Sequence, residues 1–312
     1  MNASDIRRIA IVGAGAMGQG IAQDFATHGY DVSMYARTEE RLRHALGAIE
    51  SNLSLLLQVG QTTPEDTRTT LLHLHTTTIL DTAVADADVV VEAVPEDMAL
   101  KQRIFRDLDT ACPGSTILAS TTSAILPSQL AAVTQRPDKV LVAHYFNPPY
   151  LIPLVEVVRA EQTSDDTVTT LCALLSLIGK RPAVVRKEVP GFVAARLQAA
   201  LGREALSLVE QGVASPQDID TIVRYSFGRR FSVAGLFEML DLNGLDVGLA
   251  VGEQLAPEIA SSDEGLPVLR NLVARGEVGV KAGKGFYAWT PESVADLRRR
   301  LGHALTEIAR WT

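Results

Sequence analysis

The chain has 312 residues, 46% of them hydrophobic, and a formal net charge of −8 at pH 7. This length and hydrophobic content are sufficient for two domains with buried cores. The acidic balance argues against a nucleic-acid partner, because binding a phosphate backbone needs clustered lysine and arginine, and the short basic run 298–300 is typical of a solvated helix face.

No stretch reaches the roughly 20 consecutive apolar residues of a membrane span. The N-terminal residues lead into a strand pattern without the apolar segment of a secretory signal. We therefore expect a cytoplasmic protein with no membrane partner. Cys112 and Cys172 lie far apart and lack the spacing of a metal site or of a disulfide framework, so we expect ordinary thiols and no metal.

Strand and helix patterns alternate along the first part of the chain. This alternation is typical of parallel strands joined by helical crossovers. We therefore predict an α/β fold class, in which residues 1–187 form an N-terminal Rossmann domain with a doubly wound parallel sheet. The expected strands are 6–13, 31–35, 73–79, 87–94, 115–120, 139–146, 154–160 and 181–186, and the expected helices are 17–28, 39–59, 127–132 and one that begins at 166.

After Pro190 the pattern changes to long helical segments, notably 192–211 and 216–225. This pattern predicts that residues 188–312 form a smaller all-helical domain for substrate binding and dimerisation. The segment 192–211 carries apolar residues around its circumference, so we expect it to be buried on several sides, against the first domain or a second subunit. This pattern favours a homodimer. The sequence Pro190-Gly-Phe marks the domain junction, where we expect substrate and cofactor to meet.

A glycine-rich turn directly follows the first predicted strand and opens the next helix. In this setting Gly13 permits a tight turn, Gly15 lets the backbone approach a pyrophosphate, and Gly18 lets helix and strand pack closely. The free N–H groups at the helix start also favour a phosphate. The motif therefore predicts a dinucleotide cofactor, with contacts from Gly13, Gly15, Ala16, Met17 and Gly18.

The end of the second strand bears on the choice between NAD and NADP. An NAD site usually has an acidic residue there, which binds the adenosine ribose, but this chain has Arg37 and Thr38. Arginine pairs with the ribose phosphate of NADP, and threonine adds a hydroxyl donor. The sequence leans towards NADP, although Glu39 and Glu40 keep NAD open and Arg37 alternatively marks an exposed helix start.

One histidine, His144, lies at the end of a predicted apolar strand, on the sheet edge where doubly wound folds bind their ligands. Glu156 lies inside the apolar segment LVEVV, where an unpaired carboxylate is costly to bury. We expect the two side chains to pair, with His144 as the base that removes an alcohol proton while Glu156 orients it. Asn147 and Ser123 are candidates for hydrogen bonds to a small-molecule substrate.

These residues resemble those of L-3-hydroxyacyl-CoA dehydrogenases, a family linked to fatty acid metabolism, over nearly the whole chain. The resemblance implies that His144 is the catalytic base, that Glu156 holds it, and that Ser123 and Asn147 contact the substrate. It also implies that Glu96 and Lys101 approach the cofactor. The similar segments are 13–18, 96–101, 120–123 and the motifs HYFNPP, PLVEVV, PGFVAAR and KAGKGFY.

The chain departs from the family pattern at three places. Ala195 stands where the family motif PGFxxNR has a substrate-binding asparagine, and Thr121 replaces the asparagine of an Asn-Thr-Ser stretch. The family presents basic residues to coenzyme A in the region of 51–75, where this chain has no lysine and only Arg68. A polyanionic thioester carrier would find little positive charge there.

Three hypotheses about function follow. The first is a dehydrogenase of 3-hydroxyacyl-CoA thioesters, and the second keeps the same chemistry on a free hydroxy acid or small alcohol, as in relatives that act on gulonate, carnitine or pyridine carboxylates. The third is a cofactor-binding structural protein like the lens crystallins of this fold. The retained His144 and Glu156 oppose the third hypothesis.

Overall fold

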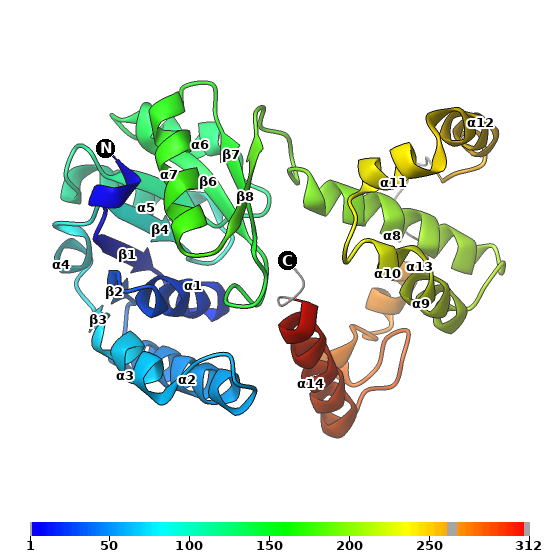
Figure 1. The fold of residues 1–312 in the computed structure, drawn as a ribbon, viewed down its shortest axis with the longest axis horizontal. Coiled ribbons are helices and arrows are strands. Elements are labelled where there is room, and N and C mark those ends of the chain that lie inside the picture. The colour runs from blue at the N-terminus through cyan, green and yellow to red at the C-terminus, as the bar shows by residue number, and fades with distance from the viewer. Residues whose placement is uncertain (1, 261–266, 309–312) are drawn as a thin grey trace. The chain divides into compact units, whose positions relative to one another are not determined.

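The computed structural model describes residues 2–260 and 267–308. It divides into two compact units, Met1–Ala195 and Arg196–Thr312. The first unit is built around a sheet and the second is built from helices (Figure 1). The predicted fold class, a Rossmann domain followed by a smaller helical domain, is confirmed.

The first unit contains an eight-stranded sheet in the order β3-β2-β1-β4-β5-β6-β7-β8. All neighbouring strands are parallel except β6 and β7, which are antiparallel. The sheet is therefore mostly parallel, as predicted, and the pair β6 and β7 is antiparallel because only residues 146–153 connect these strands, too few for a helical crossover. The strands are β1 Arg8–Val12, β2 Asp31–Tyr35, β3 Leu74–Thr77, β4 Val89–Glu92, β5 Ile117–Ser120, β6 Val140–Tyr145, β7 Leu154–Arg159 and β8 Arg181–Val185.

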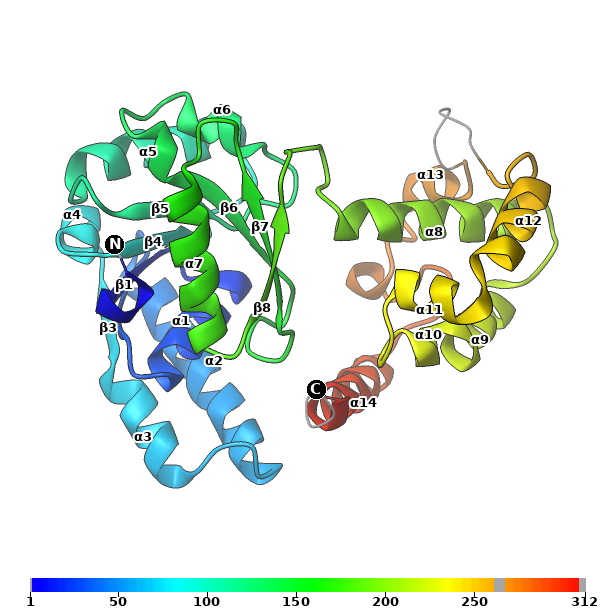
Figure 2. The same ribbon diagram turned by 45° about the horizontal axis from the view of Figure 1, so that its top comes forward.

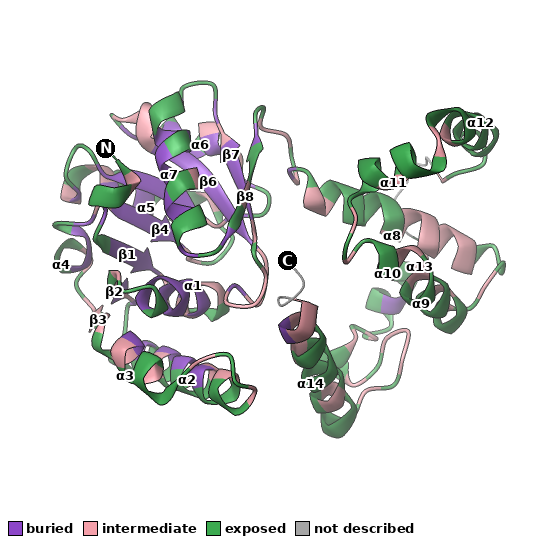
Figure 3. Ribbon diagram, viewed as in Figure 1, coloured by how far each residue is buried: buried purple, intermediate pink, exposed green. Residues whose placement is uncertain are grey.

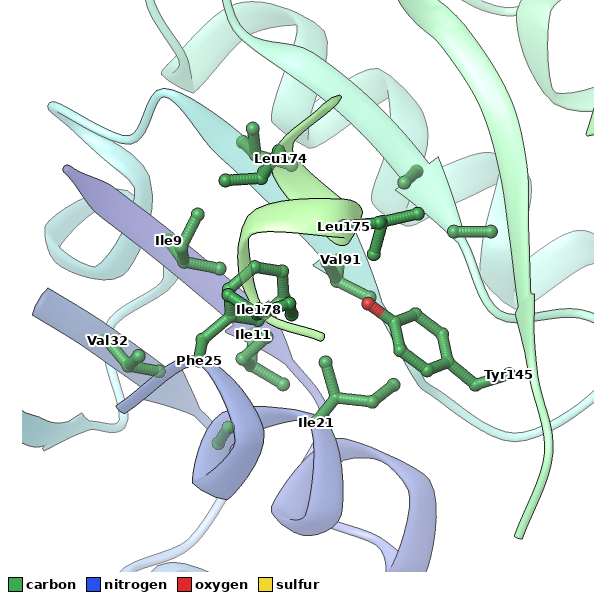
Figure 4. Packing of buried hydrophobic residues seen from close by; sticks show 14 of the residues in the cluster. Ile9, Ile11, Ile21, Phe25, Val32, Val91, Tyr145, Leu174, Leu175 and Ile178 are labelled. Carbon is green, nitrogen blue, oxygen red and sulfur yellow. The ribbon is translucent and has the colours of Figure 1, made fainter. Parts of the chain in front are cut away.

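Helices cover both faces of this sheet (Figure 2). On one face, Phe25 and Leu174 pack with Ile9 and Ile11 of β1 (Figure 4). On the other face, Phe105 belongs to a second buried cluster. The helices are α1 Ala16–Thr27, α2 Glu39–Gln58, α3 Pro64–Leu72, α4 Leu80–Val84, α5 Met98–Ala111, α6 Pro127–Ala131 and α7 Asp165–Leu177, with short 3-10 turns at Ala3–Asp5 and Pro137–Lys139.

The first unit extends beyond Lys187, where the sequence places the boundary. Phe192 is fully buried and packs with Val142, Val158 and Val185 of the sheet. The segment that follows β8 is therefore part of the first core, and the division falls after Ala195.

The second unit contains helices, a 3-10 turn at Val280–Ala282 and isolated β-bridges around Lys284. Most of the second unit is exposed or intermediate (Figure 3). Among its described residues, only Leu272 and Thr306 are buried. The second unit by itself buries no residue of α8, and the expectation that the first domain or a second subunit covers this helix stays a prediction. The helices are α8 Ala194–Glu210, α9 Pro216–Tyr225, α10 Phe227–Arg230, α11 Leu236–Asn243, α12 Leu245–Leu255, α13 Pro267–Ala274 and α14 Pro291–Ile308.

Among the described residues, no helix has the length and apolar character needed to cross a membrane. The same residues contain no cluster of histidine, cysteine and acidic side chains able to hold a metal ion.

Candidate active site

The glycine-rich turn between β1 and α1 has the close backbone approaches that only glycine allows. Gly13 has a φ of +120°, and a Cβ there would lie 2.5 Å from the carbonyl oxygen of Ala93. A Cβ on Gly18 would lie 1.9 Å from the carbonyl oxygen of Gly13. Gly15, the N-cap of α1, has open space around its Cβ position. The turn thus leaves the helix N-terminus accessible to a phosphate.

A cleft of about 680 Å³ opens above this turn, a volume usual for small-molecule sites. Glycines of the turn, the start of α1 and the ends of β2, β4 and β5 all contribute to it. The glycine-rich turn and the N-terminus of α1 therefore fit a dinucleotide. Of the predicted residues, Gly13, Gly15, Ala16, Met17, Arg37, Glu96, Lys101 and Ser123 border the cleft.

Arg37, which follows β2, and Arg41, in the first turn of α2, both border the cleft. Among the described residues, neither side chain forms an ion pair. Thr38, predicted as a cofactor contact, instead caps α2, where its hydroxyl accepts a hydrogen bond from the Arg41 N–H at 3.4 Å. Unpaired guanidinium groups at this end of the cleft are available to an anionic ligand.

The side chains of His144 and Glu156 meet across β6 and β7. The antiparallel register pairs these two residues directly, and Nδ1 of His144 lies 2.8 Å from Oε2 of Glu156. Both residues are almost fully buried. Because a carboxylate only accepts hydrogen bonds, the neutral imidazole carries its hydrogen on Nδ1 and presents the lone pair of Nε2 to Ser123.

The other oxygen of Glu156 holds the start of α8. Its Oε1 accepts hydrogen bonds from the backbone N–H groups of Val193, at 3.1 Å, and Ala194, at 2.9 Å. The carboxylate of Glu156 is therefore paired on both oxygens, which compensates its burial. Ala195, which replaces the family asparagine, directly follows these two residues.

Ser123 connects the imidazole to the cleft. Its Oγ lies 3.0 Å from Nε2 of His144, and Ser123 itself lines the cleft. Asn147 lies at the start of the connection between β6 and β7 and is exposed. The structure thus joins Glu156, His144 and Ser123 in one hydrogen-bonded chain and leaves Asn147 outside it.

Lys101 borders the same cleft but is fully buried and held by acceptors. Its Nζ lies 2.7 Å from Oε1 of Glu92, 3.2 Å from the carbonyl oxygen of Val94 and 3.6 Å from Oε2 of Glu96. Glu96 also accepts hydrogen bonds from the Thr122 hydroxyl and the Ala124 N–H. Lys101 therefore fixes the carboxylates on this wall of the cleft.

Sequence reasoning missed Glu92, which is fully buried at the end of β4 and pairs with Lys101 and the Ser120 hydroxyl. A signal was present, because Glu92 ends the apolar segment VVVE and a carboxylate there needs a partner. The same argument led to the pairing of Glu156 with His144.

Comparison with known proteins covers both units. Residues 8–189 match a family model described as 3-hydroxyacyl-CoA dehydrogenase, NAD binding domain, and residues 191–289 match the corresponding C-terminal domain. Over 308 residues the chain is 36% identical to a 5-formyl-3-hydroxy-2-methylpyridine 4-carboxylate 5-dehydrogenase of Mesorhizobium japonicum, covering 98% of both chains. It is 36% identical over 284 residues to a probable 3-hydroxybutyryl-CoA dehydrogenase of Bacillus subtilis, covering 91% of this chain and 97% of the relative.

A solved structure is also similar over nearly the full length. It is a 5-formyl-3-hydroxy-2-methylpyridine 4-carboxylic acid 5-dehydrogenase, described as an NAD⁺-dependent dismutase. The TM-score is 0.91 at 34% identity, and the alignment covers 98% of each chain.

Proposed function

This chain belongs to the 3-hydroxyacyl-CoA dehydrogenase family. On that premise we propose that His144 is its general base, and that Glu156 orients the imidazole and stabilises its positive charge. Family members are nicotinamide-dependent dehydrogenases that act on CH–OH groups. The observation that carries the proposal is the 3.0 Å contact between Nε2 of His144 and Oγ of Ser123, a residue of the cleft wall. The base is therefore one hydrogen bond from the space where a ligand binds.

The proton transfer follows from the hydrogen-bond directions. When bound, the nicotinamide supplies the acceptor for the hydride that leaves the alcohol carbon. Nε2 of His144 takes the hydroxyl proton as the C–O bond becomes a carbonyl, and Ser123 and Asn147 hold the substrate oxygens. The imidazolium then carries a positive charge, which the carboxylate of Glu156 stabilises at 2.8 Å. In the reverse direction the same imidazolium returns the proton.

We further propose that the substrate is a free hydroxy acid or small alcohol. Arg68, the one lysine or arginine between residues 51 and 75, is already paired with Glu65 at 2.5 Å. Residues 51–75, the region that the resemblance assigns to coenzyme A phosphates, therefore offer no lysine or arginine without an acidic partner. The likeness to the pyridine carboxylate dehydrogenase extends over 98% of both chains and supports the same choice.

A thioester of coenzyme A is the second candidate, favoured by the likeness to 3-hydroxybutyryl-CoA dehydrogenases. A panel of small hydroxy acids and acyl-CoA thioesters, followed by the absorbance of reduced cofactor, separates the two. We expect turnover of a free hydroxy acid and inertness towards acetoacetyl-CoA. Turnover of acetoacetyl-CoA with a micromolar KM would reject the free-acid substrate and leave the role of His144 intact.

For the cofactor, we propose that NADP binds more tightly than NAD. Arg37 and Arg41 border the cleft without ion-pair partners in the described part of the chain, so both are available to a ribose phosphate. The similar solved structure is described as NAD⁺-dependent, which makes the preference of this chain a direct test of the two arginines.

We also propose that the protein is a homodimer assembled through its second unit. Large apolar side chains of α11 and α12 are exposed in one copy, including Phe237 and Leu242 at 77% and Leu249 at 63%. Apolar patches of this extent mark interfaces in soluble proteins. Light scattering of the purified protein tests the proposal, and a monomeric mass at micromolar concentration would overturn it.

A further inference from the structure

A buried ion pair lies beneath the connection that carries Asn147. Nζ of Lys180 is 2.6 Å from Oδ2 of Asp24, and both side chains are nearly inaccessible, at 5% and 9% exposure. Asp24 belongs to α1, the helix that begins at the glycine turn, and Lys180 directly precedes β8. The hydride-transfer chemistry proposed above does not use either residue.

The ammonium group of Lys180 also holds the connection between β6 and β7. It donates hydrogen bonds to the carbonyl oxygens of Pro149, at 2.5 Å, and Ile152, at 3.3 Å. Asp24 thus fixes one cation, and that cation fixes two backbone carbonyls of the segment 147–152. The segment is tied to the cofactor helix through Lys180.

Two further contacts hold the same segment against neighbouring helices. Gly20 of α1 is so close to Pro149 that a Cβ would lie 2.9 Å from the proline Cδ. The hydroxyl of Tyr150 donates to Oδ1 of Asn52 on α2 at 3.1 Å, and Asn52 in turn donates to Gln23 of α1 at 3.1 Å. The segment is therefore also held against α1 and α2 by contacts that do not involve Lys180.

Stability alone is a poor explanation for this ion pair. Burial raises the pKa of Asp24, and the charge of Lys180 only partly opposes that effect. Buried ion pairs are often no more stabilising than apolar residues of similar volume, because desolvation offsets the attraction. What apolar residues would not supply is the set of hydrogen bonds to the carbonyl oxygens of Pro149 and Ile152.

We propose that Asp24 and Lys180 are positioning residues that set the place of Asn147 relative to the α1 end of the cleft. The side chain of Asn147 is exposed, so the backbone of its segment determines where it lies. A misplacement of about 1 Å in a substrate contact can reduce turnover about 100-fold. The kinetic test of this inference rests on the proposed contact of Asn147 with substrate. The structural test, by hydrogen exchange, does not depend on any function.

The structural arm measures hydrogen exchange of the segment by mass spectrometry. The double variant Asp24→Asn/Lys180→Met removes both charges and leaves neither ion unpaired, so the protein is expected to fold. Exchange in 147–153 should rise at least about tenfold in the double variant and in Asp24→Asn, with no change in 13–18. Unchanged exchange in 147–153 would overturn the proposal.

The kinetic arm uses the best substrate of the panel at saturating cofactor. In the double variant and in Asp24→Asn we expect kcat/KM to fall about 10- to 100-fold relative to the native protein. The Kd for reduced cofactor should change less than about twofold. Lys180→Arg, which retains charge and donors, should recover part of the loss. If exchange rises but kcat/KM is unchanged, the segment is held as argued and does not position a substrate group, which would also overturn the proposal.

The matched control is a second ion pair of the same kind in the same unit. Arg136 pairs with Asp109 at 2.9 Å and donates to the carbonyl oxygens of Pro113 and Cys112, and it lies just before β6, whereas residues 147–152 follow the other end of that strand. Asp109→Asn should destabilise the protein without altering exchange in 147–153 or kcat/KM. An equal kinetic loss in Asp109→Asn would show that general destabilisation explains the effect and would contradict positioning by Asp24.

Discussion

His144 and Glu156 face each other as a directly opposed pair on antiparallel strands, with Nδ1 of the imidazole 2.8 Å from Oε2 of the carboxylate. The second oxygen of the same carboxylate holds the amides of Val193 and Ala194. One side chain therefore orients the base and also fixes the start of α8. A change at Glu156 is expected to act on chemistry and on local structure together.

Glu156→Gln keeps the shape of the side chain and removes its charge. The imidazolium formed during alcohol oxidation then loses its counter-charge, so we expect kcat to fall about 100-fold or more. Steady-state kinetics and cofactor titration check this, and the Kd for reduced cofactor should stay within about twofold. The exposed Glu161→Gln is the matched control. A fall in kcat below about threefold would remove Glu156 from the mechanism.

Alanine substitutions in the glycine turn separate fold from binding. Gly15→Ala meets no atom within 4 Å, so it should fold normally while its methyl group weakens cofactor binding about tenfold. Gly18→Ala would place a Cβ 1.9 Å from the Gly13 carbonyl oxygen and should abolish binding. Gly47→Ala, also without neighbours within 4 Å but on α2 outside the cleft, should leave binding unchanged. Normal affinity in Gly18→Ala would contradict this view of the turn.

Glu92→Gln tests the buried pair with Lys101. The substitution leaves the Lys101 ammonium buried without its nearest carboxylate, 2.7 Å away in the native protein. We expect the free energy of unfolding to fall by about 3 kcal/mol, measured in urea. Glu161→Gln again serves as the control, and a loss below about 1 kcal/mol would show that Lys101 finds equivalent acceptors.

Arg37→Asp tests the cofactor preference. The substitution replaces a cation that attracts the ribose phosphate with an anion that repels it and accepts hydrogen bonds from a ribose hydroxyl. We expect the ratio of NADPH to NADH affinity to reverse or disappear, as measured by fluorescence titration. Equal affinities for the two cofactors before and after the change would refute a role for Arg37.

Local patterns were sufficient to predict most strands of the first unit and some helices of both units. The second strand and α9 have the expected bounds, because apolar runs and capping residues mark their ends. The helix α5 was not predicted, although Asp97 caps it and Ile104, Phe105 and Leu108 follow one face. The antiparallel direction of β7 was predictable only from the short connection between β6 and β7, because the alternation of strands and helices by itself favours parallel strands.

For the site, the costly burial of Glu156 was enough to predict its pairing with His144. The same argument applied to Glu92 would have predicted a partner but not its identity, since Lys101 lies on the following helix. The pair of Asp24 with Lys180 joins segments far apart in the chain, and neither residue stands out in its own helix or loop. Such contacts depend on the three-dimensional arrangement of β6, β7 and α1.

The central claim is that the imidazole of His144, which contacts Ser123 of the cleft wall, takes the alcohol proton. The most direct test is His144→Ala, with hydride transfer followed in a single turnover and cofactor affinity measured on the same protein. We predict a fall in the rate of hydride transfer of about 10² to 10⁴ with unchanged cofactor affinity. Hydride transfer at the native rate in this variant would contradict the assignment of His144 as the base.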